Sequence, residues 1–308
     1  MESPSTSQLI SRIQLVDFPG IRLLHQIGTG GMSTIWKAYS QKLGQHVAVK
    51  VLNTDLSNKS DEIRAFREEE RFMEEISHPG VVRAYDFNCC EGFWYFVMEY
   101  VDGYAFSDLL KRKGFIKESD CLLIGQSVAS ALDYAWNNHG IVHCDIKPEN
   151  IMINSEGVVK LTDLGISHRF QYLDNGAQTT PEQVMGTPAY ISPEQVYGDV
   201  ELDCRADIYS LGATLYHLST GRILFPLLSN DATMLAHCTD TNQADDPRHY
   251  RPELSKGFAQ LLEVMLVKDR EERIQSWQGV FDMATSVEQG FCFQPRETTG
   301  PSSIRLNP

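Results

Sequence analysis

Residues 143–150 read His-Cys-Asp-Ile-Lys-Pro-Glu-Asn, and residues 163–165 read Asp-Leu-Gly. In the first stretch, Asp145 can accept the proton of a hydroxyl group, Lys147 can neutralise a moving anion, and Asn150 offers an oxygen ligand to a metal. Three such groups within one short turn predict an active site.

The segment between these two stretches predicts a β-hairpin. Residues 151–154 and 158–162 are rich in apolar side chains and flank the turn sequence Ser155-Glu156-Gly157. The second strand would return Asp163 to the neighbourhood of Asn150. Mg²⁺ suits this pair of ligands, because it binds a few protein oxygens together with nucleotide phosphates.

The hydrophobic pattern predicts an α+β fold. Strands are expected at residues 21–27, 34–39, 46–52 and 93–100, and one helix is expected at residues 61–76. From Ser119 onward helices dominate, including one that stops near Gly140 and a buried one at residues 207–218. The expected parts are an N-terminal extension (1–20), a small β-rich lobe with one helix (21–100), a larger mainly helical lobe (103–288) and a flexible tail or shortened linker (289–308).

A glycine-rich stretch joins the first two predicted strands. It reads Gly28-Thr29-Gly30-Gly31-Met32-Ser33-Thr34-Ile35. Its backbone N–H groups could cover a triphosphate, although a plain glycine turn would give the same pattern. No helix pattern follows, which disfavours a Rossmann turn and a Walker-type loop.

The strand Val47-Ala48-Val49-Lys50 ends in a lysine that the apolar alternation points inward. A buried ammonium needs a partner. Glu69 shares the apolar face of the predicted helix with Phe66 and Met73, so it is expected to pair with Lys50. The other glutamates are expected to form a solvated acidic face: Glu70, Glu74 and Glu75.

Together these motifs resemble the protein-kinase signature, and the chain resembles bacterial, eukaryotic-like (Hanks-type) serine/threonine kinases over about residues 21–287. The resemblance implies a two-lobed protein kinase fold and transfer of the ATP γ-phosphate to protein Ser or Thr hydroxyls, with autophosphorylation. It implies that Asp145 is the catalytic base and that Lys147 contacts the γ-phosphate. Lys50, paired with Glu69, would hold the α- and β-phosphates.

The resemblance also implies the residues that bind ATP and metal. Asn150 and Asp163 would ligate Mg²⁺, with Mn²⁺ as an alternative. Met98 would be the gatekeeper, and Glu99 and Val101 would bind adenine through hinge backbone groups. The expected ATP-binding set is Gly28, Thr29, Gly30, Gly31, Met32, Ser33, Ile35, Ala48, Lys50, Met98, Glu99 and Val101.

Residues 186–194 resemble the family's substrate-reading segment, which supports a protein substrate over a small molecule. Thr187 before Pro188, together with Lys147, resembles the pattern of Ser/Thr kinases and not that of Tyr kinases. Two structural roles are also implied: Glu194 would pair with Arg273, and Asp207 would brace the catalytic loop.

The chain departs from the family pattern at four positions: Ser33 for the third glycine, Leu164 for Phe, Ser192 for Ala and Cys144 for the Arg before the catalytic Asp. Ser33 is expected to reduce the flexibility of the stretch but to keep the backbone N–H that would cover phosphate. Leu164 replaces one apolar side chain with another, and Ser192 is expected to be harmless. Cys144 could be a reactive or a structural thiol, and the structural role is favoured. Cys144 cannot bind a phosphate placed on Thr179 or Thr180 as an arginine would. Arg169 or Arg205 could take the place of the missing arginine.

The composition excludes several other classes of protein. A net charge of −14 over 308 residues disfavours nucleic acid as a partner. No apolar run reaches the ~18 residues of a membrane span, so a cytoplasmic chain without a membrane segment is expected. Seven cysteines without a C-x-x-C pair predict reduced thiols, and the adjacent Cys89 and Cys90 are interpreted as strand-end residues.

Protein substrates and ATP are the expected partners, and a homodimer is not excluded. The rival hypothesis is a pseudokinase that serves as a scaffold. It would lack at least one of Lys50, Asp145 and Asp163, and all three are present.

Overall fold

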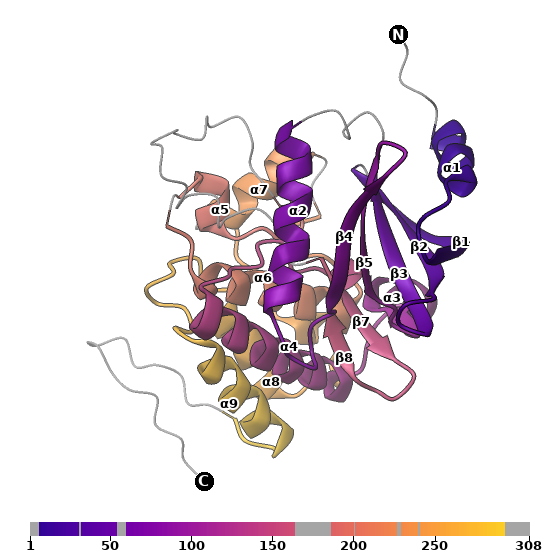
Figure 1. Ribbon diagram of the computed structural model, residues 1–308. Coiled ribbons are helices and arrows are strands. Elements are labelled where there is room, and N and C mark those ends of the chain that lie inside the picture. Colours follow the sequence, from indigo (N-terminus) through magenta and orange to yellow (C-terminus); the bar gives the residue numbers. More distant parts are fainter. Residues whose placement is uncertain are drawn as a thin grey trace. The chain divides into compact units, whose positions relative to one another are not determined.

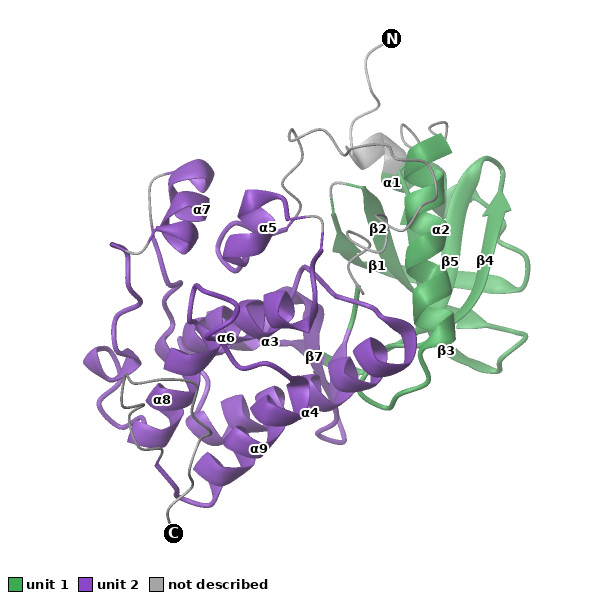
Figure 2. Cartoon of the chain, turned by 90° about the vertical axis from the view of Figure 1, so that its left-hand side faces the viewer, with its two compact units in different colours: residues 1–103, 162–166 green, residues 104–161, 167–308 purple. Residues whose placement is uncertain are grey.

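The computed structural model describes residues 6–30, 32–53, 60–163, 186–199, 201–226, 229–239 and 241–292. The chain divides into two compact units, residues 1–103 with 162–166 and residues 104–161 with 167–308 (Figure 2). Some predictions fall outside the described residues: those for Gly31, Leu164, Gly165, Arg169, Thr179, Thr180 and residues 293–308.

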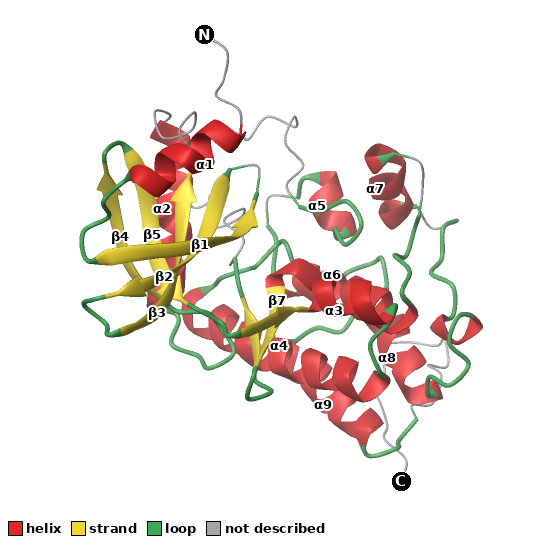
Figure 3. Ribbon diagram, turned by 90° about the vertical axis from the view of Figure 1, so that its right-hand side faces the viewer, coloured by secondary structure: helices red, strands yellow, loops and turns green. Residues whose placement is uncertain are grey.

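An antiparallel five-stranded sheet in the order β1-β2-β3-β5-β4 forms most of the first unit (Figures 1 and 3). The predicted strands and the predicted helix are confirmed with slightly different ends, whereas α1 and β4 were not predicted. The elements are α1 (Thr6–Leu15), β1 (Ile21–Thr29), β2 (Ser33–Ser40), β3 (Gln45–Leu52), α2 (Ser60–Glu75), β4 (Ala84–Cys90) and β5 (Phe93–Glu99).

The two faces of this sheet carry different side chains, because side chains alternate along each strand, and different parts of the chain cover them. On β3, Val47, Val49 and Val51 belong to the core cluster of one face. Lys50 lies on the opposite face, which α2 covers: Phe66 of α2 contacts the ring of Phe96, with 4.9 Å between the ring centroids.

The face opposite α2 is covered by the segment that precedes β1, and Figure 3 shows α1 beside the strands. Ile13, Val16 and Phe18 are buried in one cluster with Trp36 and the three β3 valines. Phe18 contacts Tyr95 edge to face at 4.8 Å between ring centroids. Part of the predicted extension therefore completes the core of the first unit. Its sequence signal is weak because these apolar positions straddle the end of a helix and share no single period.

We predict that Phe18→Ala lowers the free energy of unfolding of the first unit by about 3–5 kcal/mol, because it leaves a cavity among buried side chains. Denaturant unfolding followed by tryptophan fluorescence measures this loss, since Trp36 is 1% exposed in the same cluster. Leu15→Ala is the control, because Leu15 is 84% exposed. The control should change stability by less than about 0.5 kcal/mol, and equal losses in the two variants would contradict the packing role.

The second unit is mainly helical and centres on α6, which is buried on nearly every side. The predicted helix at 207–218, the helix stop near Gly140 and the hairpin before Asp163 are confirmed. The elements are β6 (Gly103–Ala105), α3 (Phe106–Lys113), α4 (Glu118–His139), η1 (Pro148–Asn150), β7 (Ile151–Asn154), β8 (Val159–Leu161), α5 (Pro193–Tyr197), α6 (Cys204–Thr220), α7 (Asn230–Cys238), η3 (Pro247–His249), α8 (Lys256–Met265) and α9 (Trp277–Glu288).

Helices α4 and α9 pack along each other, and α8 contacts both α6 and α9. The strands β6, β7 and β8 form a small separate sheet. Among the described residues, no helix is both long and apolar enough to cross a membrane. The cytoplasmic location stays a prediction.

Candidate active site

The glycine-rich stretch is the connection between β1 and β2. Gly28 pairs with Ile35 in the strand register, and the N–H of Gly30 donates to the carbonyl of Ser33 at 2.8 Å. A Cβ at Gly28 would lie 3.5 Å from the side chain of Ile35, which is ordinary contact. The stretch is thus a hairpin without a following helix, as predicted, and Gly31 lies outside the described residues.

Lys50 lies between two carboxylates of the first unit. Its ammonium forms an ion pair with Glu69 of α2, and Nζ lies 2.8 Å from Oδ1 of Asp163. The predicted Lys50–Glu69 pair is therefore confirmed, and the additional contact with Asp163 was not predicted. Asp163 has φ +48°, a left-handed conformation that is uncommon for a residue with a side chain.

The charged groups of this cluster shift one another's pKa values. Burial lowers the pKa of Lys50, but the attraction of Asp163 and Glu69 outweighs this effect, so its pKa is raised and the ammonium stays charged. Burial raises the pKa of Glu69, whereas the contact with Lys50 opposes that change. Glu69 and Asp163 thus fix the position of the Lys50 ammonium.

The prediction that Glu70 belongs to a solvated face is wrong. Glu70 is 6% exposed, whereas Glu74 is exposed. The reason is its spacing: Glu70 follows the buried Phe66 by four residues and therefore lies on the same side of α2. Burial raises the pKa of Glu70, with nearby Glu74 adding to the effect.

In the second unit, Asp145 lies between an ammonium and a hydroxyl group. Lys147 Nζ donates to Asp145 Oδ2 at 2.6 Å, and Thr187 Oγ1 donates to Asp145 Oδ1 at 2.7 Å. Lys147 Nζ also lies 2.9 Å from Thr187 Oγ1. The structure thus brings together three of the predicted residues from two separate segments of the chain.

Asn150 is anchored to the same turn. Its Nδ2 donates to the carbonyl of Asp145 at 2.9 Å and approaches Asp145 Oδ2 at 3.3 Å. Because the amide nitrogen is used in this way, the oxygen is the atom with which Asn150 would meet a cation. Asn150 belongs to the second unit and Asp163 to the first.

Asp207 braces the turn that carries Asp145, as predicted. Its two carboxylate oxygens accept the N–H groups of His143 at 2.6 Å and Cys144 at 2.7 Å. Burial raises the pKa of Asp207 to about 7, while these two hydrogen bonds oppose the change. The backbone before Asp145 is therefore fixed from within α6.

Cys144 is a buried thiol, 2% exposed, in a left-handed conformation with φ +64°. Its Sγ faces the carbonyl of Val142 at 3.7 Å. Burial raises the pKa of the thiol well above its ordinary value, and the charges of Asp207 and Asp145 add to this effect. A reactive cysteine needs the opposite shift, so this environment favours the structural role.

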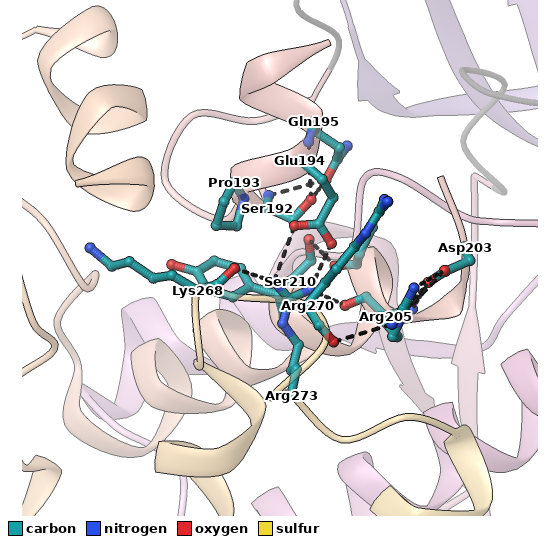
Figure 4. Close-up of polar contacts among 12 residues, drawn as sticks. Ser192, Pro193, Glu194, Gln195, Asp203, Arg205, Ser210, Lys268, Arg270 and Arg273 are labelled. Atoms are coloured by element: carbon teal, nitrogen blue, oxygen red, sulfur yellow. Dashed lines mark hydrogen bonds and ion pairs between the residues drawn. The ribbon is translucent and has the colours of Figure 1, made fainter. Parts of the chain in front are cut away.

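Glu194 and Arg273 form the predicted ion pair, and Figure 4 shows them facing each other. Arg273 is 1% exposed and donates to both carboxylate oxygens of Glu194, at 2.6 and 3.1 Å. It also donates to the carbonyls of Val267 and Lys268. The pair joins α5 to the segment that follows α8.

Arg205 is already engaged with carboxylates of its own. Its Nη2 lies 2.8 Å from Asp203 Oδ2 (Figure 4), and its Nη1 lies 3.0 Å from Glu271 Oε2. The hypothesis that Arg205 substitutes for the missing arginine therefore loses support, because a phosphate would have to displace these partners. Arg169 lies outside the described residues.

The predicted adenine-binding residues lie at the end of β5 and just after it. Met98 is 5% exposed and pairs with Ala48 in the strand register. The N–H of Glu99 donates to the carbonyl of Arg83 at 2.8 Å, and Val101 is buried. Ala48 and Met98 thus occupy neighbouring positions on β3 and β5.

Ser192 is not a neutral replacement for Ala. It is fully buried and caps α5: its Oγ accepts the N–H of Gln195, whose side chain in turn accepts the N–H of Ser192. This reciprocal capping box has the sequence pattern S-x-x-Q, which could have revealed both residues. The sequence pattern did not lead to Gln195, whose side chain also donates to the backbone carbonyl of Cys144, just before Asp145.

Comparison with known proteins gives consistent matches. The model of the family described as "Protein kinase domain" matches residues 21–284. The probable serine/threonine-protein kinase CPE1738 of Clostridium perfringens is 36% identical over 254 residues, which are 82% of this chain. The serine/threonine-protein kinase PknA of Mycobacterium tuberculosis is 34% identical over 93% of this chain.

The crystal structure of the PknI kinase domain of Mycobacterium tuberculosis has the same fold, with a TM-score of 0.67 at 24% identity over 89% of this chain and 98% of that one. The chain spans only 36% of the length of CPE1738 and 65% of the length of PknA. The matches therefore concern one part of these longer relatives.

Proposed function

Because this chain belongs to the protein kinase family, we propose that it transfers the γ-phosphate of ATP to Ser or Thr hydroxyl groups of proteins, its own chain included. Kinases of this family use ATP and a divalent metal. The observation that carries the proposal is the arrangement of Asp145, Lys147 and Thr187, in which a hydroxyl donates to a carboxylate beside an ammonium.

In the proposed step, the oxygen of a substrate hydroxyl bonds to the γ-phosphorus while the bond from that phosphorus to the bridging oxygen of ADP breaks. The hydroxyl proton passes to Asp145, and ADP leaves with the electron pair of the broken bond. Lys147 would offset the charge on the moving phosphoryl group. The Lys50 ammonium would hold the α- and β-phosphates.

Mg²⁺ is the proposed metal, and Asn150 and Asp163 would hold it. One amide oxygen and one carboxylate suit Mg²⁺, because it retains water and phosphate ligands instead of filling its shell with protein groups. When bound, the ion would supply positive charge to the phosphates.

Mass spectrometry of the purified chain, incubated with Mg-ATP and a general protein substrate, tests the proposal. Phosphate on Ser or Thr of either protein is the expected result. Absence of transfer to both proteins, under conditions in which the chain binds ATP, would favour the pseudokinase hypothesis instead.

We predict that phosphorylation of Thr179 or Thr180 is not the activating switch. A buried thiol at position 144 offers no bidentate donor to a phosphate, and Arg205 is paired with Asp203 and Glu271. The double variant Thr179→Ala with Thr180→Ala should therefore keep its activity on an exogenous protein within about threefold of wild type, which is less than ~1 kcal/mol of barrier.

Mass spectrometry must first establish that the wild-type sample carries phosphate at one of these threonines. The activity of a matched wild-type sample treated with phosphatase serves as the control for phosphorylation at other sites. A loss of about a hundredfold in the variant would contradict the prediction and would point to Arg169 as the receptor.

A further inference from the structure

Gln195 connects two segments of the second unit whose relative position matters for the proposed reaction. They are the turn that carries Asp145 and residues 186–194. Its side chain is 3% exposed at the third position of α5. Nε2 donates to the backbone carbonyl of Cys144 at 2.8 Å, and Oε1 accepts the N–H of Ser192 at 3.1 Å and its hydroxyl at 2.9 Å. Figure 4 shows the contact between Gln195 and Ser192.

These contacts define the orientation of the amide. The N–H of Ser192 needs an acceptor, and the carbonyl of Cys144 needs a donor, so one orientation of the Gln195 amide satisfies both. All three residues are buried. Breaking either bond would leave a buried polar group without that partner, which makes the bridge a firm restraint.

The peptide unit between Cys144 and Asp145 is held from both sides. Gln195 donates to its carbonyl, that of Cys144, and its N–H, that of Asp145, donates to His143 Nδ1 at 3.3 Å. Asp207 accepts the N–H of Cys144 in the preceding peptide unit. The plane of the peptide between Cys144 and Asp145 sets the direction in which the Asp145 side chain leaves the backbone. The Gln195 bond therefore helps to aim the carboxylate.

The same amide lies against the start of the substrate-reading segment. A Cβ at Gly186, where φ is +133°, would lie 3.4 Å from Gln195 Nε2. The next residue is Thr187, whose hydroxyl contacts both Asp145 and Lys147. The Gln195 side chain thus bonds to Ser192 and to the turn that carries Asp145, and it lies near Gly186 at the start of the segment.

We propose that Gln195 is a positioning residue that fastens residues 186–194 to the turn carrying Asp145, without any phosphorylated residue. This inference rests on the proposed kinase function. It gives a physical reason why the turn can stay ordered although Cys144 supplies no cation for a phosphate.

The isosteric variant Gln195→Glu tests the proposal. At about pH 8 the introduced carboxylate has no proton for the Cys144 carbonyl, so kcat/KM for a protein substrate should fall about 10- to 100-fold. The Kd of ATP should change less than about twofold, because Lys50 and the glycine-rich hairpin are untouched. The exposed Gln278→Glu in α9 is the matched control and should behave as wild type.

A pH profile separates positioning from a general structural defect. The introduced carboxyl can donate to Cys144 once it is protonated, and burial together with the nearby carboxylates Asp145, Asp207 and Glu194 favours that form, while Arg273 is paired with Glu194. Relative to wild type at each pH, Gln195→Glu should recover at least about threefold between about pH 8 and pH 6. Gln195→Met, which has no polar group, should lose activity without this recovery.

Hydrogen exchange tests the restraint without turnover. In Gln195→Glu at about pH 8, amides of residues 142–147 and 186–192 should exchange faster, while those of α9 should not change. Unchanged exchange in both segments, or a kcat/KM within about threefold of wild type at every pH, would refute the positioning role. A wild-type chain that transfers no phosphate would refute the proposed function alone, since the exchange result still decides the restraint.

Discussion

Asp163→Asn should lower phosphoryl transfer by about 1,000-fold or more at saturating Mg²⁺ while leaving the fold intact. The change keeps the size of the side chain but removes the negative charge that Asp163 offers to Lys50 and, in the proposed site, to a metal. The side chain is 34% exposed, so the change opens no cavity. Activity and stability are therefore expected to respond very differently.

Turnover of a protein substrate, measured over a series of Mg²⁺ concentrations, checks the first part, and circular dichroism during thermal unfolding checks the second. Asp282→Asn is the control, because it removes an exposed carboxylate from α9. If Asp163→Asn retains more than about a tenth of wild-type activity, the assignment of Asp163 as a metal ligand is wrong.

Sequence reasoning succeeded where one residue had few ways to satisfy its chemistry. An inward-pointing ammonium such as Lys50 must find a carboxylate, and Glu69 lies on the apolar face of the next helix. The bracing role of Asp207, which the family resemblance implied, is likewise met by donors, the backbone N–H groups of His143 and Cys144. In both cases the cost of an unpaired buried charge leaves few alternatives.

Other features depended on tertiary packing that no local pattern reveals. The burial of Ile13, Val16 and Phe18 follows from the apolar face of the sheet that they cover. The bond from Gln195 to Cys144 joins residues far apart in sequence. The burial of Glu70 was misread because its polarity was given more weight than its spacing from Phe66.

The second large effect concerns the cluster around Lys50, where Lys50→Met and Glu69→Gln are expected to be strongly non-additive. Each variant alone should lower kcat/KM for ATP about 100-fold, because each removes the ion pair that fixes the ammonium. Once Lys50 is gone, the buried Glu69 faces the carboxylate of Asp163 without a cation between them. It then takes up a proton, and a neutral Glu already resembles Gln.

The double variant should therefore be within about threefold of Lys50→Met, which corresponds to a coupling energy of roughly 2–3 kcal/mol. Glu74→Gln provides the control on the same helix, because Glu74 is exposed and should show no coupling to Lys50→Met. If the losses simply multiplied to about 10,000-fold, Lys50 and Glu69 would act independently. The contact between them would then contribute to the structure of the first unit without orienting the lysine for ATP.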